Sequence, residues 1–182
     1  TSNIKKNFYA DILAKNALKL LNHNLAKVLK NGADLEARQN MLVGSMLAGQ
    51  AFSNAPVGAV HALAYPLGGH FHLSHGHSNA LVLVEVLKFN APKAKQYYAE
   101  LMQLLDPRST GCTDGLCDLF IDHMQNHLDQ SGLTLKLKNL DIPEAKLPQL
   151  AKDALLQTRL LQNNPRELTE QDALQIYQAI YA

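Results

Sequence analysis

The sequence has few cysteines, no concentrated charge and no long hydrophobic run, and each of these absences excludes a class of protein. The two thiols, Cys112 and Cys117, fit neither the C-x-x-C redox spacing nor a zinc ribbon, so two reduced cysteines are expected. The net charge is +1, and the lysines and arginines are spread along the chain. Nucleic acid is therefore not an expected partner.

The hydrophobic segments are too short for a membrane protein. No run approaches the roughly 20 apolar residues that a membrane-spanning helix needs, and residues 1–6 lack the apolar core of a signal peptide. We therefore expect a soluble, cytoplasmic protein with no membrane partner. With 182 residues, of which 47% are hydrophobic and 18% charged, the chain has a globular composition. One compact domain over residues 1–182 is the default expectation.

Apolar residues recur three and four positions apart along most of the chain, which predicts an all-α fold of roughly seven to nine helices. Asp34 is the expected N-cap of the second helix, and small residues around Gly44 and Gly49 predict close packing there. The sequence Thr-Glu-Gln-Asp at residues 169–172 predicts a helix-capping arrangement. The expected helices cover about residues 4–29, 34 onward, 57–64, 75 or 78 to 88, 93–105, 114–128, 143–161 and 169–181.

Three segments are predicted to interrupt the helices. Proline and glycine at residues 66–69 and the sequence Asn-Ala-Pro at residues 90–92 are expected to end the helices that precede them. Residues 133–138 alternate between apolar and polar, as a strand would. Because a lone strand leaves its backbone hydrogen bonds unsatisfied, we expect an extended connector there.

Five of the eight histidines lie between positions 61 and 77, and this clustering predicts a metal site. A neutral imidazole is the commonest protein ligand for zinc, iron, copper and nickel. His61 falls on one expected helix and His75 at the start of the next, which can place a metal rigidly between two elements. His70, His72 and His77 complete the cluster. The alternative is a solvated, histidine-rich surface loop.

A second histidine pair stands apart from this cluster. His123 and His127 are four residues apart on an expected helix, a spacing that can clamp a metal. No further histidine or acidic residue at helical spacing supports a site, beyond Asp122 and Asp129. A structural role is the favoured interpretation for this pair.

The residues around the histidine cluster contain three motifs: A-F-x-N-A from Ala51, V-H-x-x-x-x-P-L-G from Val60 and H-G-x-x-N-A from His75. In this order they closely resemble the signature of the iron-containing (group III) alcohol dehydrogenases. Residues 35–38 and 158–166 also look like the family, so the resemblance covers the whole chain. It implies the helical C-terminal domain of the dehydroquinate synthase-like, iron-containing alcohol dehydrogenase fold. The N-terminal domain that binds NAD or NADP is expected to be absent from this chain.

The resemblance also implies the site residues. His61 and His75 match the family's last two metal-binding histidines, with iron the expected metal and zinc or nickel as alternatives. The other two family ligands, an aspartate and a histidine four residues apart, are expected to precede Thr1. Tyr65 occupies a position near the nicotinamide and the substrate that is often histidine, and it is the candidate catalytic residue. A phenol can hydrogen-bond or pack there, but it does not supply imidazole acid–base chemistry near neutral pH.

The function implied is reversible hydride transfer between a small alcohol or aldehyde and a nicotinamide, with the metal polarising the substrate oxygen. Both domains are needed to align the two reacting carbons, so this chain alone is expected to be inactive. The sequence departs from the usual family pattern at Ser74, His77 and residues 83–85, and these departures concern the choice of substrate. Two alternatives stay open: a stand-alone helical module that binds metal or a partner without redox activity, and a helical homo-oligomerisation domain with an exposed apolar face.

Overall fold

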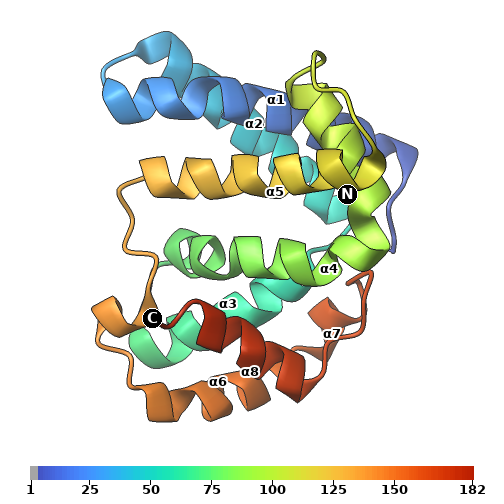
Figure 1. Ribbon diagram of the computed structural model, residues 1–182. Coiled ribbons are helices and arrows are strands. Elements are labelled where there is room, and N and C mark those ends of the chain that lie inside the picture. Colours follow the sequence, from blue (N-terminus) through green and yellow to red (C-terminus); the bar gives the residue numbers. More distant parts are fainter. Residues whose placement is uncertain (1–3) are drawn as a thin grey trace. The chain divides into compact units, whose positions relative to one another are not determined.

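The computed structural model describes residues 4–182, and they form helices and connecting segments with no β-strand (Figure 1). The elements in chain order are α1 (Phe8–Lys30), α2 (Leu35–Asn54), α3 (Ala59–Phe71), α4 (His75–Leu105), α5 (Thr113–Gln130), η1 (Leu137–Leu140), η2 (Glu144–Lys146), α6 (Leu147–Leu155), α7 (Thr158–Leu161) and α8 (Glu170–Ala179). The predicted all-α fold is confirmed. Among the described residues, no helix combines the length and the hydropathy required to cross a lipid bilayer.

The chain divides into two compact units. Unit 1 contains the residues up to Pro56 together with Ala94–Ser131, and unit 2 contains Val57–Lys93 and Gly132–Ala182. The division falls within α4, directly after Lys93. The single domain expected over residues 1–182 stays a prediction.

In unit 1, α1 and α2 pack closely against each other. The side chain of Asp34 accepts a hydrogen bond from the backbone N–H of Ala37 and caps α2, as predicted. A Cβ atom added to Gly44 would lie 2.9 Å from both Cγ and Cδ2 of Leu21, whereas one added to Gly49 would meet nothing within 4 Å. The predicted close packing is therefore confirmed at Gly44, but Gly49 does not contribute to it.

The contrast between these two glycines predicts opposite effects of the same substitution. Gly49→Ala should raise the free energy of unfolding by about 0.5–1 kcal/mol, because alanine restricts the unfolded chain and favours a helix interior. Gly44→Ala should destabilise the protein relative to Gly49→Ala by about 1–3 kcal/mol, because the new methyl group overlaps Leu21. Urea denaturation of the two variants measures both changes. Equal unfolding midpoints would contradict the assignment of Gly44 to a close helix contact.

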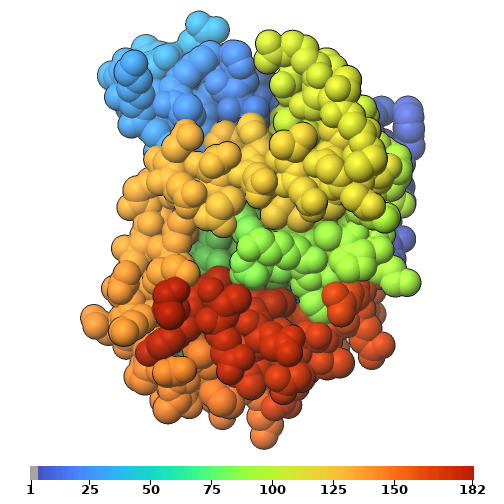
Figure 2. All heavy atoms as spheres, viewed as in Figure 1, coloured from blue at the N-terminus to red at the C-terminus, as the bar shows by residue number. Residues whose placement is uncertain are grey.

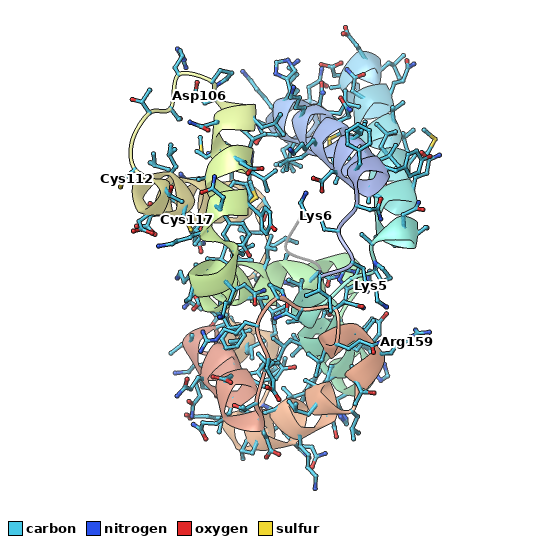
Figure 3. The ribbon with its side chains drawn as sticks, turned by 90° about the vertical axis from the view of Figure 1, so that its right-hand side faces the viewer. Lys5, Lys6, Asp106, Cys112, Cys117 and Arg159 are labelled. Atoms are coloured by element: carbon cyan, nitrogen blue, oxygen red, sulfur yellow. The ribbon has the colours of Figure 1, made fainter. Side chains whose placement is uncertain are left out.

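The two cysteines lie at the start of α5 and within it (Figure 3). Both are free thiols, as expected, with Cys112 exposed and Cys117 buried. The Cys112 sulfur caps α5 by accepting a hydrogen bond from the backbone N–H of Gly115. Burial, and then the nearby carboxylates of Asp118 and Asp114, raise the pKa of Cys117, so this thiol stays protonated and unreactive.

In unit 2, apolar side chains from α3, α4, α6 and α8 form one buried cluster. Tyr177 on α8 is fully buried, and its hydroxyl donates a 2.6 Å hydrogen bond to the backbone carbonyl of Leu63 on α3. The packed pair α6 and α8 is coloured orange and red in Figure 2. Thr169 and Asp172 form the predicted capping box at the start of α8. The core of unit 2 thus fixes the helix that carries His61.

Two predicted helix ends are wrong. Helix α3 starts at Ala59 rather than at residue 57, and it continues through Pro66 and the following glycines to Phe71. Helix α4 likewise continues through Pro92 to Leu105. A proline inside a helix removes one backbone hydrogen bond and kinks the helix, but buried packing can offset this cost. Pro66 is itself buried, beside the fully buried Leu67, which supplies such packing.

The C-terminal region also differs from the expected pattern. The single helix expected over residues 143–161 is divided into η2, α6 and α7. Residues 133–136 form the predicted extended connector, but Leu137 begins the short 3-10 helix η1. The backbone N–H of Leu137 donates to the carbonyl of Ile180, so part of the connector's backbone is paired with the end of the chain.

Candidate metal centre

The structure brings together the three predicted site residues, all within unit 2. His61 lies on α3, and His75 is the first residue of α4. Their ring centroids are 5.1 Å apart. The Tyr65 ring lies 6.2 Å from the His75 ring and 6.5 Å from the His61 ring. The assignment of the two histidines as metal ligands stays a prediction, but their convergence fits it.

The local sequence explains this convergence. His61 and Tyr65 are four residues apart and share one face of α3, while Ala62, Leu63 and Leu67 are buried. Helix α3 ends at His72, which adopts the left-handed conformation at φ 56° and donates its backbone N–H to the carbonyl of Gly68. Only two further residues precede α4. This short reversal places the first turn of α4 beside α3.

The start of α3 is held by residues that are distant in the sequence. The N-cap residue Gly58 has no side chain, and Asn164 supplies the missing acceptor for the backbone N–H of Ala59. Asn164 also forms a reciprocal amide pair with Asn90, with N···O distances of 3.0 and 2.7 Å. Asn163 donates to the carbonyl of Val57. These contacts fix the helix end that lies just before His61.

The two imidazoles differ in burial. His61 is half-buried, whereas His75 and Tyr65 are exposed. Burial, followed by the electrostatic effect of His75, lowers the pKa of His61 below its usual value. Its ring is therefore neutral near pH 7 and keeps the lone pair that a metal ligand requires.

Asn79 is the asparagine of the H-G-x-x-N-A motif, and it contacts the site although the sequence assigned it no role. Its amide nitrogen lies 3.0 Å from Nε2 of His75 and donates to the backbone carbonyl of the same residue at 2.9 Å. Since the amide nitrogen only donates, His75 Nε2 accepts and carries a lone pair. The spacing of four residues on one helix was the signal available in the sequence. This hydrogen bond occupies the single lone pair of Nε2, so a metal that binds there displaces the Asn79 amide.

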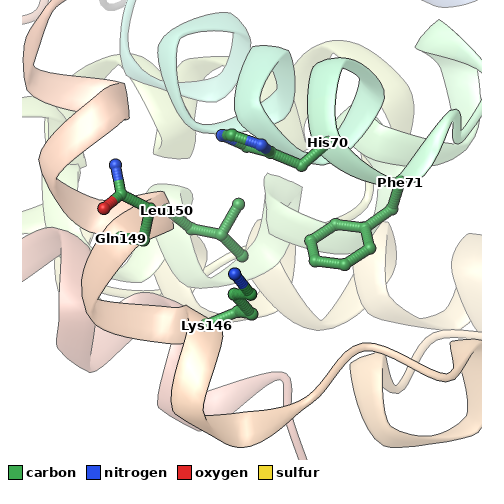
Figure 4. Close-up of a pocket in the computed structure, with 5 residues that line it drawn as sticks. All are labelled: His70, Phe71, Lys146, Gln149 and Leu150. Carbon is green, nitrogen blue, oxygen red and sulfur yellow. The ribbon is translucent and has the colours of Figure 1, made fainter.

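The other three histidines of the cluster do not join the site. His70 Nε2 lies 2.7 Å from a carboxylate oxygen of Asp153, and His77 Nε2 lies 2.6 Å from the carbonyl oxygen of Thr134. His72 is exposed at the end of α3. His70 also lines a small pocket with Phe71, Lys146, Gln149 and Leu150 (Figure 4). The clustering in sequence therefore combines one convergent pair with histidines that have other contacts.

The donor set fits part of a metal site. Two neutral imidazoles are suitable ligands for iron, zinc or nickel. Among residues 4–182, no three histidine, cysteine, aspartate or glutamate side chains are grouped closely enough to hold an ion together. His61 and His75 can therefore supply two ligands, and a complete site needs donors from elsewhere.

Comparison with known proteins supports one family. The model of the C-terminal region of the Fe-containing alcohol dehydrogenase family matches residues 2–181. The long-chain-alcohol dehydrogenase 1 of Geobacillus thermodenitrificans is 38% identical over 174 residues, which cover 95% of this chain and 44% of that protein. The 1,3-propanediol dehydrogenase of Klebsiella pneumoniae is 33% identical over 172 residues, which cover 94% of this chain and 44% of that protein.

Solved structures show the same fold. A crystal structure of a 1,3-propanediol oxidoreductase matches with a TM-score of 0.94 at 30% identity, covering 98% of this chain and 47% of that one. An alcohol dehydrogenase from Oenococcus oeni matches with a TM-score of 0.92 at 30% identity, covering 99% of this chain and 47% of that one. The chain thus spans less than half the length of these relatives. It belongs to the Fe-containing alcohol dehydrogenase family and corresponds to the family's C-terminal helical region.

Proposed function

We propose that this chain is the metal- and substrate-binding part of an NAD- or NADP-dependent alcohol dehydrogenase, which interconverts an alcohol and an aldehyde or ketone. The observation that carries the proposal is the 5.1 Å separation of the His61 and His75 rings at the junction of α3 and α4. The relatives named as dehydrogenases of long-chain alcohols and 1,3-propanediol support the same chemistry. A cytoplasmic location and a homo-oligomeric assembly belong to the proposal.

In this proposal His61 and His75 hold a divalent metal, with iron favoured and zinc or nickel as alternatives. When bound, such a metal acts as a Lewis acid toward an alcohol or carbonyl oxygen. The burial of His61 keeps its ring unprotonated, and a metal that binds Nε2 of His75 displaces the hydrogen bond from Asn79. The ring of His61 is therefore prepared as a ligand before a metal arrives.

Tyr65 is proposed to position the substrate. Its side chain is 41% exposed, and its ring lies beside both imidazoles, so a small molecule can reach it. A phenolic hydroxyl both donates and accepts hydrogen bonds, and it can orient the oxygen of an alcohol or an aldehyde. The nicotinamide cofactor is proposed to bind residues of the complete protein outside the helical region described here.

A side-by-side assay tests the proposal. The complete protein and the 182-residue chain would be compared by elemental analysis and by alcohol-dependent reduction of NAD and NADP. We expect about one divalent metal ion per complete protein and measurable turnover, and weaker metal retention without turnover for the chain alone. A metal-loaded complete protein that binds an alcohol but reduces neither cofactor would instead favour a metal-binding module without redox activity.

A further inference from the structure

The histidine pair on α5 meets a third polar side chain from α1 within unit 1. The Nε2 atoms of His123 and His127 are 3.2 Å apart. The side-chain oxygen of Asn22 lies 2.5 Å from the first of these nitrogens and 2.7 Å from the second. Residues more than a hundred positions apart in the sequence therefore direct three polar atoms at one point.

Without a metal, hydrogen bonding accounts for two of the three contacts. A neutral imidazole carries one N–H, and the amide oxygen of Asn22 only accepts. If both rings are protonated at Nε2, both donate to the Asn22 oxygen, and the 3.2 Å contact between the two nitrogens is then not a hydrogen bond. If either ring is unprotonated there, its lone pair faces the lone pairs of the oxygen. If both rings carry their proton on Nδ1 instead, a cation placed among the three atoms accepts a lone pair from each.

The separation of the two imidazole nitrogens also suits a transition metal. Zinc binds histidine nitrogen and protein oxygen at ~2.0–2.2 Å, so neighbouring donors of a tetrahedral ion lie about 3.3 Å apart. The two nitrogens, at 3.2 Å, already have this separation. The oxygen is closer, and a small rotation of the Asn22 side chain increases its distance from both rings. The third donor is the amide oxygen of Asn22, so the site consists of two histidines and one neutral oxygen ligand.

The surroundings favour the ligand form of both histidines. Asn22 on α1 and His123 and His127 on α5 are all half-buried. Burial lowers the pKa of His123, and burial followed by the effect of His123 lowers the pKa of His127. Both rings are therefore neutral near pH 7 and compete little with protons for a metal.

We propose that Asn22, His123 and His127 form a second metal site, which takes a divalent late transition metal such as zinc and leaves a fourth position for water. The site joins α1 to α5, and its occupation stabilises unit 1, because the unfolded chain does not hold the three donors together. The proposal is independent of the alcohol dehydrogenase chemistry, since it uses neither His61 nor His75.

Zinc titration of the His61→Ala/His75→Ala chain tests the proposal without interference from the first pair. Calorimetry should give one zinc ion per chain, and the imidazole nitrogen resonances of His123 and His127 should shift on binding. His123→Ala and His127→Ala should each weaken zinc binding at least tenfold, whereas His23→Ala, the matched control on the exposed side of α1, should leave it unchanged. Equal zinc affinity in His123→Ala and in its parent would overturn the proposal.

A gain of affinity separates metal binding from a general loss of structure. Asn22→Asp replaces the neutral amide oxygen with a carboxylate, which is a stronger ligand for zinc. We expect this variant to bind zinc at least tenfold more tightly than its parent, with unchanged circular dichroism. Unchanged or weaker zinc binding by the folded Asn22→Asp variant would show that position 22 does not ligate the ion and would overturn the three-residue site.

Discussion

His61→Ala and His75→Ala are each expected to abolish metal-dependent turnover in the complete protein. Each change removes one of two imidazoles whose rings lie 5.1 Å apart. Loss of a bound metal removes several kcal/mol of transition-state stabilisation, which corresponds to about 10³-fold or more in kcat/KM. Elemental analysis of the purified variants, followed by an alcohol–NAD(P) assay, measures both the metal content and the rate.

His70→Ala is the matched control for these two variants. His70 belongs to the same sequence cluster and to the same helix as His61, but it contacts Asp153 and lies at the pocket shown in Figure 4. This variant should keep its metal and nearly all its activity, because surface substitutions of this kind have small effects. Normal turnover and metal content in His61→Ala or His75→Ala would contradict the ligand assignment.

The largest expected stability effect belongs to Asn164→Ala. This change removes the acceptor of the Ala59 N–H at the start of α3 and leaves both polar atoms of the Asn90 amide without their partner. Asn90 is only 2% exposed, so water does not easily replace the lost bonds. Each unsatisfied buried group costs about 1–3 kcal/mol, and we expect a total loss of about 2–4 kcal/mol.

Urea denaturation followed by circular dichroism measures this loss. Asn139→Ala is a suitable control, because Asn139 is an exposed asparagine of the same unit. Its unfolding midpoint should stay within about 0.5 kcal/mol of the parent. If Asn164→Ala unfolds at the same urea concentration as the control, the amide network does not hold the start of α3.

Much of the helical fold follows from local patterns in the sequence. The all-α fold, the Asp34 cap and the Thr169–Asp172 capping box were predicted and are confirmed. These features depend on residues within one or two helical turns, so a short stretch of sequence is sufficient to specify them. The motifs around His61 and His75 also identified the family, because their residues and spacing are specific.

Local preference did not predict that two helices continue through a proline, one buried at Pro66 and one exposed at Pro92. Pro66 and Pro92 were expected to end helices, yet both lie inside helices. The local preference of proline against a helix interior is outweighed when the flanking residues gain more from packing than the lost hydrogen bond costs. The sequence does not reveal that packing, because burial depends on how whole helices come together.

By itself, the sequence determined the helical class, the helix caps, the family and the histidines proposed to bind metal. Only the tertiary structure decided that His61 and His75 converge while His70 and His77 have other partners. It alone also brought Asn22 to the pair on α5. The physical reason is that helix formation depends on neighbours a few residues apart, whereas the direction of a side chain toward a distant partner depends on how whole helices pack.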